Sequence, residues 1–221
     1  MILNKEVFYF SYCFMKYLTP NMPFPDVSEA TEEGLLAIGG DLSVERLLDA
    51  YKHGIFPWFS TDEPILWWSP NPRFVLFPEK LKVSKSMKQV LRNSDFEITI
   101  NKDFKSVITA CSKIKRQGQN DTWITKSMQE AYINLHELGF AKSVEVWQHN
   151  VLVGGLYGVD LGNGIFCGES MFAKVNNASK VGFISFIQNS NYKLIDCQVY
   201  TNHLESLGAE EIPRDVFLSY L

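Results

Sequence analysis

The pattern of apolar and polar positions predicts a chain in which strands alternate with helices. Apolar runs typical of strands occupy residues 73–77, 96–100, 143–148, 151–160, 164–171 and 193–200. The helices are expected at 84–91, 103–116, 126–138 and 177–190, and Gly139 follows the third of them. Strands and helices in this order, with a meander of strands in the middle, predict an α/β (α+β) fold.

The first seventy residues lack the regular alternation of strands and helices expected for the rest of the chain. Residues 19–34 are rich in proline and acidic side chains and are expected to form an irregular surface stretch, and residues 35–43 lead into a helix. Ser43 is a good N-cap for that helix, and Gly54 stands where it would end. We expect a small N-terminal domain at 15–72 and a second domain at 73–221. Residues 1–14 are expected to be an upstream extension, with Met15 as the natural start.

Tryptophan and proline are concentrated between residues 54 and 73. Trp58, Trp67 and Trp68 share this stretch with four prolines, so it should form neither a regular helix nor a central strand. Two interpretations remain open: a rigid, well-packed junction between domains, or a wall that lines a ligand site. Aromatic rings in such a segment also suit stacking on unpaired bases.

Composition narrows the function classes. The 221 residues are 46% hydrophobic and 21% charged, which supports a sizeable core, and the net charge of −4 argues against a general binder of duplex DNA. The four cysteines show no CxxC pairing and no histidine set at metal-ligand spacing, so neither a disulfide framework nor a metal site is expected. The simple interpretation is a cytoplasmic protein with reduced thiols.

Three polar residues interrupt apolar strands. Asp196 and Gln198 lie two positions apart in one strand, and residues i and i+2 of a strand point to the same face. Glu169 stands among aromatic and sulfur side chains of an earlier strand. Burying an unpaired polar group costs roughly 2–7 kcal/mol, so these residues should meet a polar partner or a polar ligand.

The familiar catalytic patterns are missing. None of the four histidines lies in a recognisable Ser or Cys motif, and GxSxG, GxGxxG and P-loop motifs are absent, which argues against hydrolase and metalloenzyme chemistry. The remaining candidate is a hydrophobic pocket with a few polar groups at its mouth, which is what recognition of a small molecule requires. The expected pocket residues are Leu156, Phe166, Met171, Phe183, Phe186 and Ile195, each of which could equally be ordinary core.

A cluster of basic residues also has two interpretations. Lys85, Lys88 and Arg92 belong to the helix expected at 84–91 and its end. Such a run is usually a solvated helix face, but in an acidic protein it is also what contact with an RNA backbone would require.

Nine ordered segments carry a specific resemblance. GLLAIGGDLS, GIFPWFS, ILWWSPNPR, ELGFAKSVEVW, LVGGLYGV, FCGESMF, NNASK, KLIDCQV and SLGAEEIPR resemble, in this order, the bacterial leucyl/phenylalanyl-tRNA–protein transferases, from about residue 15 to the C-terminus. The resemblance implies a small N-terminal domain and a C-terminal acetyltransferase-like (GNAT-type) domain. It also implies transfer of Leu or Phe, and Met less well, from aminoacyl-tRNA to proteins that begin with Arg or Lys, which marks them for N-degron degradation.

The resemblance also assigns roles to residues. It implies that Asp196 and Gln198 are catalytic, with Glu169 in the CGES segment beside them, and that the six pocket residues hold the Leu or Phe side chain. Trp58 and Trp123 match aromatic residues near the aminoacyl-adenosine end. Lys85, Lys88 and Arg92 match a basic cluster that holds the tRNA, although Gln89 and Asn93 replace basic residues of some members. The implied protein is a monomer that needs no cofactor, no metal and no membrane.

The sequence leaves the roles within this polar group open. Either Asp196 polarises Gln198, whose carbonyl oxygen then accepts a hydrogen bond from the attacking amine, or Gln198 orients the amine and Asp196 supplies negative charge. Glu169 would attract the cationic acceptor or hold the aminoacyl amine. In either case Cys197 is expected to point away from the reaction. Two rival functions remain: an acyl-CoA-dependent N-acetyltransferase, although the stretch 175–180 lacks a Gly-rich pyrophosphate loop, and a non-catalytic RNA-binding module.

Overall fold

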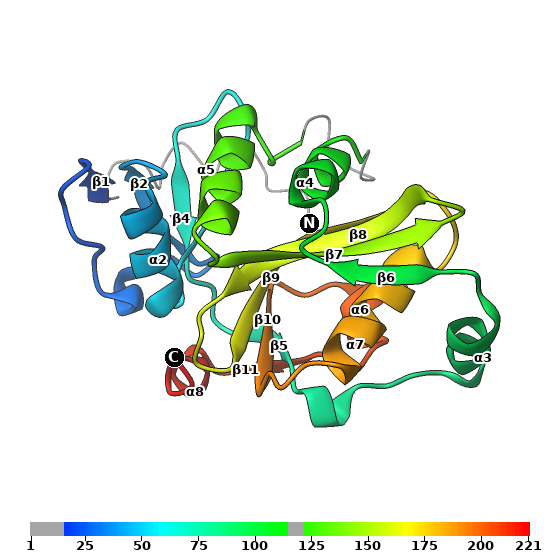
Figure 1. Ribbon diagram of the computed structural model, residues 1–221. Helices are drawn as coiled ribbons and strands as arrows, with labels where there is room; N and C mark the ends of the chain where they lie inside the picture. Colours follow the sequence, from blue (N-terminus) through cyan, green and yellow to red (C-terminus); the bar gives the residue numbers. More distant parts are fainter. Residues whose placement is uncertain (1–15, 115–121) are drawn as a thin grey trace.

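The chain folds into two β-sheets flanked by helices (Figure 1). The computed structural model describes residues 16–114 and 122–221. The extension expected at 1–14 lies outside the described residues, as does the end of the helix expected at 103–116.

The smaller sheet is built from residues 16–68. Its strand order is β1-β2-β4-β3, with bounds Lys16–Leu18 (β1), Leu35–Gly39 (β2), Phe56–Pro57 (β3) and Leu66–Trp68 (β4). A short 3₁₀ turn, η2 (Val27–Glu29), interrupts the proline-rich surface stretch before β2.

The tryptophan-rich segment contains a strand inside the smaller sheet, contrary to expectation. β4 is an interior strand, paired with β2 on one side and β3 on the other, so the prediction that this segment contains no central strand is wrong. The strand is compatible with the prolines because it is only three residues long and Pro64 and Pro70 lie outside it. Trp67 and Trp68 are buried, and Trp67 Nε1 donates to the carbonyl oxygen of Gly39 at 2.9 Å.

The first long helix, α2 (Val44–Lys52), packs against the smaller sheet and begins and ends as its sequence predicts. Ser43 Oγ accepts a hydrogen bond from the Arg46 backbone N–H at 3.3 Å, which satisfies one of the free N–H groups of the first turn. Gly54 follows the helix with φ of 71°, a conformation that glycine adopts without strain. The turn leads directly into β3, which lines the site described below.

The larger sheet follows from residue 73 onward in the order β11-β5-β10-β9-β8-β7-β6. β10 pairs with β9 in parallel and with β5 antiparallel, and the other neighbours pair antiparallel. The bounds are Arg73–Leu76 (β5), Glu97–Ile100 (β6), Ala141–Gln148 (β7), Val151–Asp160 (β8), Ile165–Ala173 (β9), Leu194–Gln198 (β10) and Glu210–Ile212 (β11).

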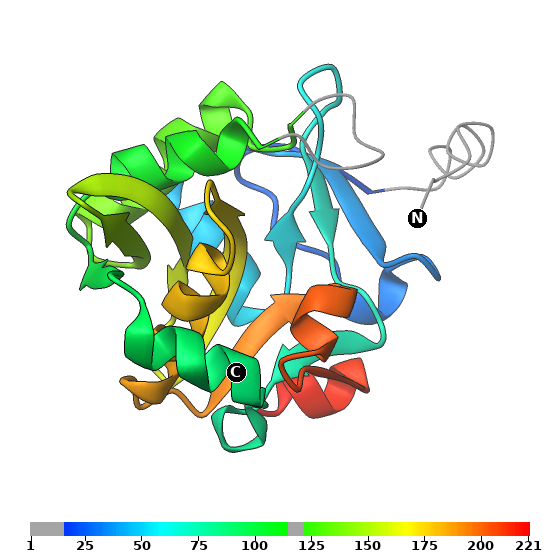
Figure 2. The same ribbon diagram turned by 90° about the vertical axis from the view of Figure 1, so that its right-hand side faces the viewer.

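Helices cover both faces of this sheet (Figure 2). α4 (Phe104–Ser112) and α5 (Lys126–Glu137) pack on one face, and α5 also touches α2. α6 (Ala178–Gln188) packs on the other face and contacts α3 (Lys85–Asn93). The short elements are η3 (Pro78–Lys80), α7 (Asn202–Glu205) and α8 (Arg214–Leu218).

The predicted α/β class is confirmed, since strands and helices alternate in one mixed architecture. The strand expected at 193–200 is shorter than predicted and ends at Gln198. The two sheets derive from either side of residue 72, but the domain boundary itself stays a prediction. In the described part of the chain, no helix combines the length and apolarity that a membrane crossing requires.

Candidate active site

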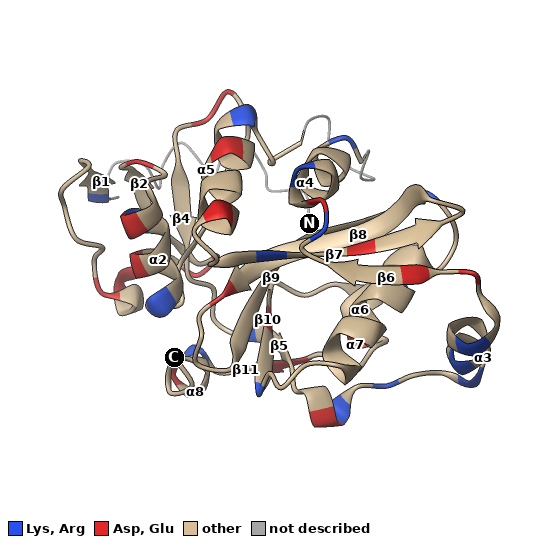
Figure 3. Cartoon of the chain, viewed as in Figure 1, with Lys and Arg blue, Asp and Glu red and all other residues tan. Residues whose placement is uncertain are grey.

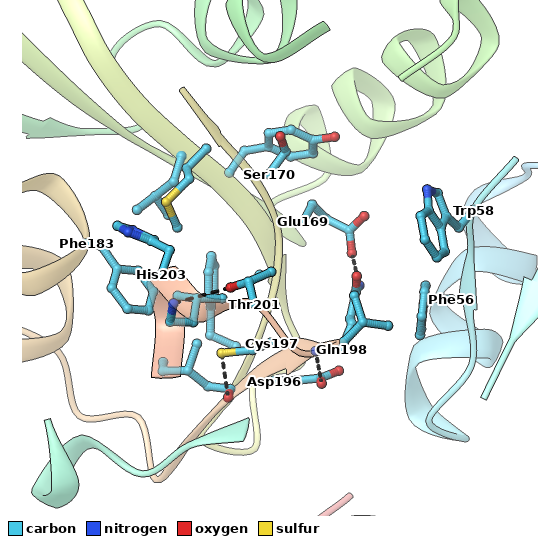
Figure 4. Close-up of a pocket in the computed structure, with 18 of the residues that line it drawn as sticks. Phe56, Trp58, Glu169, Ser170, Phe183, Asp196, Cys197, Gln198, Thr201 and His203 are labelled. Carbon is cyan, nitrogen blue, oxygen red and sulfur yellow. Dashed lines mark hydrogen bonds between the residues drawn. The ribbon is translucent and has the colours of Figure 1, made fainter. Parts of the chain in front are cut away.

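A cavity of about 480 Å³ lies where the end of β10 faces β3 of the smaller sheet (Figure 4). Its lining combines residues of β3, β8, β9, α6 and the β10–α7 segment. Drug-sized and cofactor-sized ligands occupy pockets of roughly 300–1,000 Å³, so this volume fits a small organic group rather than a single ion.

One end of the cavity is apolar. Five of the six predicted pocket residues line it: Leu156, Phe166, Met171, Phe183 and Ile195. The sixth, Phe186, is buried behind them, with its ring edge-on to Phe166 at a centroid distance of 4.8 Å. Phe186 therefore supports the pocket wall and does not line the cavity.

The other end of the cavity is polar. There the chain departs from the regular pattern in which residues i and i+2 of a strand point to the same face. The ladder between β10 and β5 shifts register between Asp196 and Gln198, and Gln198 has φ of 64°. The two side chains therefore do not share a face as the regular alternation predicts, because a bulge redirects the chain at this point. Cys197 lies in the cavity lining together with Ile195, two positions before it on the same strand, so the expectation that Cys197 points away is wrong.

Asp196 is fully buried and paired with Arg73. Arg73 Nε and Nη2 donate to the two carboxylate oxygens at 2.8 and 2.6 Å, and Nη1 donates to the Gly54 carbonyl oxygen at 3.1 Å. The guanidinium also lies over the rings of Phe56 and Phe217 at 4.8 and 4.7 Å. This bidentate pair resolves the cost of burying Asp196 without any ligand.

The contact between Asp196 and Gln198 runs through the backbone. The Gln198 N–H donates to Asp196 Oδ1 at 2.9 Å. The Gln198 side-chain amide instead points to Glu169, and its Nε2 donates to Glu169 Oε1 at 2.7 Å (Figure 4). Polarisation of the Gln198 amide therefore comes from Glu169, and Asp196 fixes the backbone turn that presents Gln198 to the cavity.

Glu169 collects hydrogen bonds from two further elements. Tyr51 of α2 donates to Oε1 at 2.7 Å, Tyr132 of α5 donates to Oε2 at 3.0 Å, and the two phenol oxygens contact each other. Burial raises the pKa of Glu169 to about 7; the hydrogen bonds from the two tyrosines and Gln198 oppose the rise, and nearby Asp196 adds to it. A carboxyl group with this pKa changes its protonation state near neutral pH.

The two tyrosines act as neutral donors at neutral pH. Burial, reinforced by the charge of Glu169, raises the pKa of both Tyr51 and Tyr132 well above the ordinary value. Tyr51 comes from the smaller-sheet region and Tyr132 from a helix on the larger sheet, so the carboxylate is held from both sides.

Aromatic rings form another wall. Trp58 and Trp123 both line the cavity, and Trp58 leans on Trp68 at a ring distance of 5.8 Å. Trp68 Nε1 donates to the Trp58 carbonyl oxygen at 2.7 Å. The tryptophan-rich segment therefore serves two places: Trp67 is packed in the core, while Trp58 lines the cavity.

The basic residues lie on a separate surface. Lys85, Lys88 and Arg92 are exposed on α3, where basic positions are coloured blue (Figure 3). With Gln89 and Asn93 they line a depression on the surface. α3 contacts α6, whose Phe183 lines the cavity, so this surface and the cavity share one supporting helix.

Sequence reasoning missed several residues of the site. Arg73, Tyr51 and Tyr132 were assigned no role, because a lone arginine in a strand and tyrosines in amphipathic helices resemble ordinary core and surface positions. His203 was also set aside, yet it lines the cavity. Burial, together with nearby Lys180, lowers the pKa of His203, and its Nε2 has no hydrogen-bond partner within the described residues.

Metal-ligand geometry does not occur in the part of the chain that the structure describes: no group of three or more His, Cys, Asp or Glu side chains could hold an ion there. Cys167 and Cys197 are free thiols. The polar chemistry of the cavity therefore rests on a carboxylate, an amide, two phenols and a buried ion pair.

Fold and site together define a mixed α/β protein whose apolar pocket opens onto a carboxylate–amide pair, as in enzymes that bind an apolar side chain next to a reacting group. The family profile described as leucyl/phenylalanyl-tRNA protein transferase matches residues 75–221, and the profile of that family's N-terminal domain matches residues 40–71. The chain belongs to this family, which confirms the predicted resemblance.

The chain is similar to curated transferases along nearly its whole length. A leucyl/phenylalanyl-tRNA–protein transferase of Flavobacterium johnsoniae is 61% identical over 210 residues, which are 94% of this chain and 99% of that protein. The one from Pseudomonas syringae pv. syringae is 53% identical, over 91% of this chain and 89% of the relative. A GCN5-related N-acetyltransferase from Kribbella flavida has a TM-score of 0.37 and 9% identity, over 74% of this chain and 58% of that one.

Proposed function

We propose that the chain transfers Leu or Phe, and Met less efficiently, from aminoacyl-tRNA to the N-terminal α-amine of proteins that begin with Arg or Lys. The observation that carries the proposal is one continuous cavity with an apolar pocket at one end and Glu169 with Gln198 at the other. Membership of the transferase family supports the same reaction and disfavours both rivals, an acyl-CoA-dependent acetyltransferase and a non-catalytic RNA-binding module.

The apolar end suits the transferred side chain. Leu156, Met171 and Phe183 surround a space whose walls offer no charge, and unbranched-β side chains such as Leu, Phe or Met can enter it. Ile and Val would crowd the wall at their branched Cβ, and each misplaced methyl group costs about 1–3 kcal/mol in a hydrophobic pocket. Selection therefore works by shape.

The polar end suits the reacting groups. An aminoacyl ester is already activated, and an α-amine has a pKa of roughly 8, so alignment of amine and ester supplies much of the rate. In this proposal Gln198 and Glu169 contact the acceptor amine, and Asp196, held by Arg73, positions the backbone of Gln198. The reaction forms an amide from an ester without redox change, so it needs no cofactor.

The tRNA would be held at two places. Trp58 and Trp123 line the cavity and would stack on the terminal adenosine. Stacking of one base on an aromatic ring is worth about 1–3 kcal/mol. Lys85, Lys88 and Arg92 would pair with phosphates of the acceptor arm. Gln89 and Asn93 add no charge to this surface, so the three cations would carry the contact.

The proposal has consequences for the cell. Leu or Phe added to an N-terminal Arg or Lys would mark the acceptor for N-degron degradation, and charged tRNA places the reaction in the cytoplasm. Both ends of the cavity come from one chain, so a monomer at low concentration should suffice.

The test is a transfer assay. Purified protein is mixed with radiolabelled Leu-tRNA and a peptide that begins with Arg, and the label in the peptide is counted with and without acetyl-CoA. Matched peptides that begin with Ala, and reactions with Ile-tRNA, serve as controls. Label in the Arg peptide alone, independent of acetyl-CoA, supports the proposal; equal use of Ile-tRNA, or RNA binding without transfer, would overturn it.

A further inference from the structure

The two carboxylates of the site differ in what they can accept. Both oxygens of Asp196 are held by Arg73, and Oδ1 also accepts the Gln198 N–H. The guanidinium of Arg73 is 1% exposed, and Asp196 supplies its counter-charge. An uncompensated buried charge is strongly unfavourable, so Asp196 is committed to this ion pair.

Glu169, unlike Asp196, is not paired with a buried cation. It lines the cavity, it is partly exposed to it, and its hydrogen-bond donors are uncharged: two phenols and one amide. When Glu169 gains a proton, no buried cation loses a partner, and the added O–H can turn toward a phenol oxygen. The site thus has one carboxylate committed to structure and one that can change its charge.

We propose that Glu169, rather than Asp196, is the carboxylate that takes the proton from the acceptor's α-amine, with Tyr51 and Tyr132 as positioning residues. This inference rests on the proposed function and specifies its chemistry. Gln198 lies between the two carboxylates: its backbone N–H is bound to Asp196 and its side-chain Nε2 is bound to Glu169. Its amide is therefore held beside Glu169 in the cavity wall, and in this proposal the acceptor amine binds there.

The proposed transfer conserves atoms and electrons. The nitrogen of the acceptor amine attacks the ester carbonyl carbon, and the C–N bond forms. The nitrogen gives its proton to a carboxylate oxygen of Glu169. The C–O bond to the terminal adenosine then breaks, and Glu169 returns the proton to the departing ribose oxygen. The products are an amide and a free tRNA 3′ end, and Glu169 is a carboxylate again.

The electrostatic surroundings support this use of Glu169. Burial raises its pKa to about 7, against the hydrogen bonds from Tyr51, Tyr132 and Gln198, and the charge of Asp196 adds to the rise. Arg73 on β5 faces Asp196 and not Glu169, and the neighbouring thiol of Cys167 stays protonated because burial raises its pKa. A base with a pKa near the working pH transfers protons most effectively.

The inference also gives the smaller-sheet region a part in the chemistry. Tyr51 belongs to α2, and its hydroxyl reaches Glu169 across the boundary with the larger sheet. Tyr132 reaches the other oxygen from α5, which packs against α2. The position of the carboxylate thus depends on the contact between these two helices.

The test compares pH profiles of leucine transfer to an Arg-initiated peptide, with Leu-tRNA saturating and pH varied from about 5.5 to 9. For the wild type we expect kcat/KM to rise through two ionisations, one near 7 from Glu169 and one near 8 from the α-amine. Glu169→Gln should lower kcat about a hundredfold or more and leave only the amine ionisation. Tyr51→Phe removes one donor to Glu169, so its first ionisation should move to higher pH.

The controls separate the alternatives. Glu97→Gln changes an exposed carboxylate of β6 and should leave the profile unchanged. If Glu169 only attracts the cationic acceptor, Glu169→Gln will raise KM for the Arg peptide and keep kcat within about threefold, and the inference is then wrong. An unshifted Tyr51→Phe profile in a folded variant also counts against it. Absence of transfer by the wild type would overturn the proposed function as well, so the two failures are distinct.

Discussion

Replacing Arg73 by methionine should destabilise the chain far more than loss of an ordinary surface ion pair. Arg73 is 1% exposed, and it gives Asp196 two hydrogen bonds at 2.8 and 2.6 Å and the Gly54 carbonyl a third at 3.1 Å. Arg73→Met leaves the buried carboxylate of Asp196 without a counter-charge. Removing one partner of such a pair typically costs about 3–5 kcal/mol, a large share of the roughly 5–15 kcal/mol that stabilises a domain.

The assay is urea unfolding followed by tryptophan fluorescence at neutral pH. Lys80→Met is the matched control, because Lys80 pairs with Glu210 on the surface with side chains 50% and 40% exposed. We expect that control to lose less than about 1 kcal/mol of the free energy of unfolding. The double variant Arg73→Met/Asp196→Leu should lose less than Arg73→Met alone, since an apolar pair needs no counter-charge.

Activity gives an independent readout of the same change. Asp196 Oδ1 fixes the Gln198 backbone N–H at 2.9 Å, so the double variant should stay folded and still transfer leucine poorly. The reasoning is refuted if Arg73→Met costs no more than Lys80→Met, or if the double variant costs as much as the two single changes added together.

Three further predictions concern the pocket, the basic helix and pH. Phe183→Ala should enlarge the apolar pocket and lower kcat/KM for Leu-tRNA about tenfold or more. The ratio of kcat/KM for Leu-tRNA to that for Ile-tRNA should also fall. If transfer assays find this ratio unchanged, the pocket assignment is contradicted. A variant with Gln at Lys85, Lys88 and Arg92 should bind tRNA more weakly, with a smaller dependence of affinity on salt. Filter binding from about 50 to 200 mM salt measures both effects. Transfer from a short aminoacyl-adenosine substrate, which does not reach this surface, should be unaffected. Because burial raises the folded-state pKa of Glu169 from 4.5 to about 7, its contribution favours folding below pH 4.5 and is lost as pH rises through 7. Wild type should therefore lose up to roughly 3 kcal/mol more than Glu169→Gln between pH 4.5 and 8 in urea unfolding, and parallel losses would show that the shift is absent.

The alternation of strands and helices could be predicted from the sequence because its cause is local. Strands at 151–160 and helices such as α5 are set by the period of their apolar residues, and the N-cap Ser43 and the glycines that follow α2 and α5 mark where helices begin or end. β4 was missed because its place inside a sheet depends on pairing with β2 and β3, which no three-residue pattern reveals.

Within the site, the sequence by itself determined which residues are unusual, and only the tertiary structure decided what they do. Asp196, Gln198 and Glu169 stand out because burying polar groups in apolar strands is costly, and that cost can be read from one strand at a time. Their partners, Arg73, Tyr51 and Tyr132, lie 123, 118 and 37 residues away from the groups they bind. A bulge at Gln198 also interrupts the regular alternation of side chains along β10. The hydrogen bonds of each carboxylate depend on residues far away in the sequence. The apolar and polar pattern of one strand does not show which distant residues will contact it.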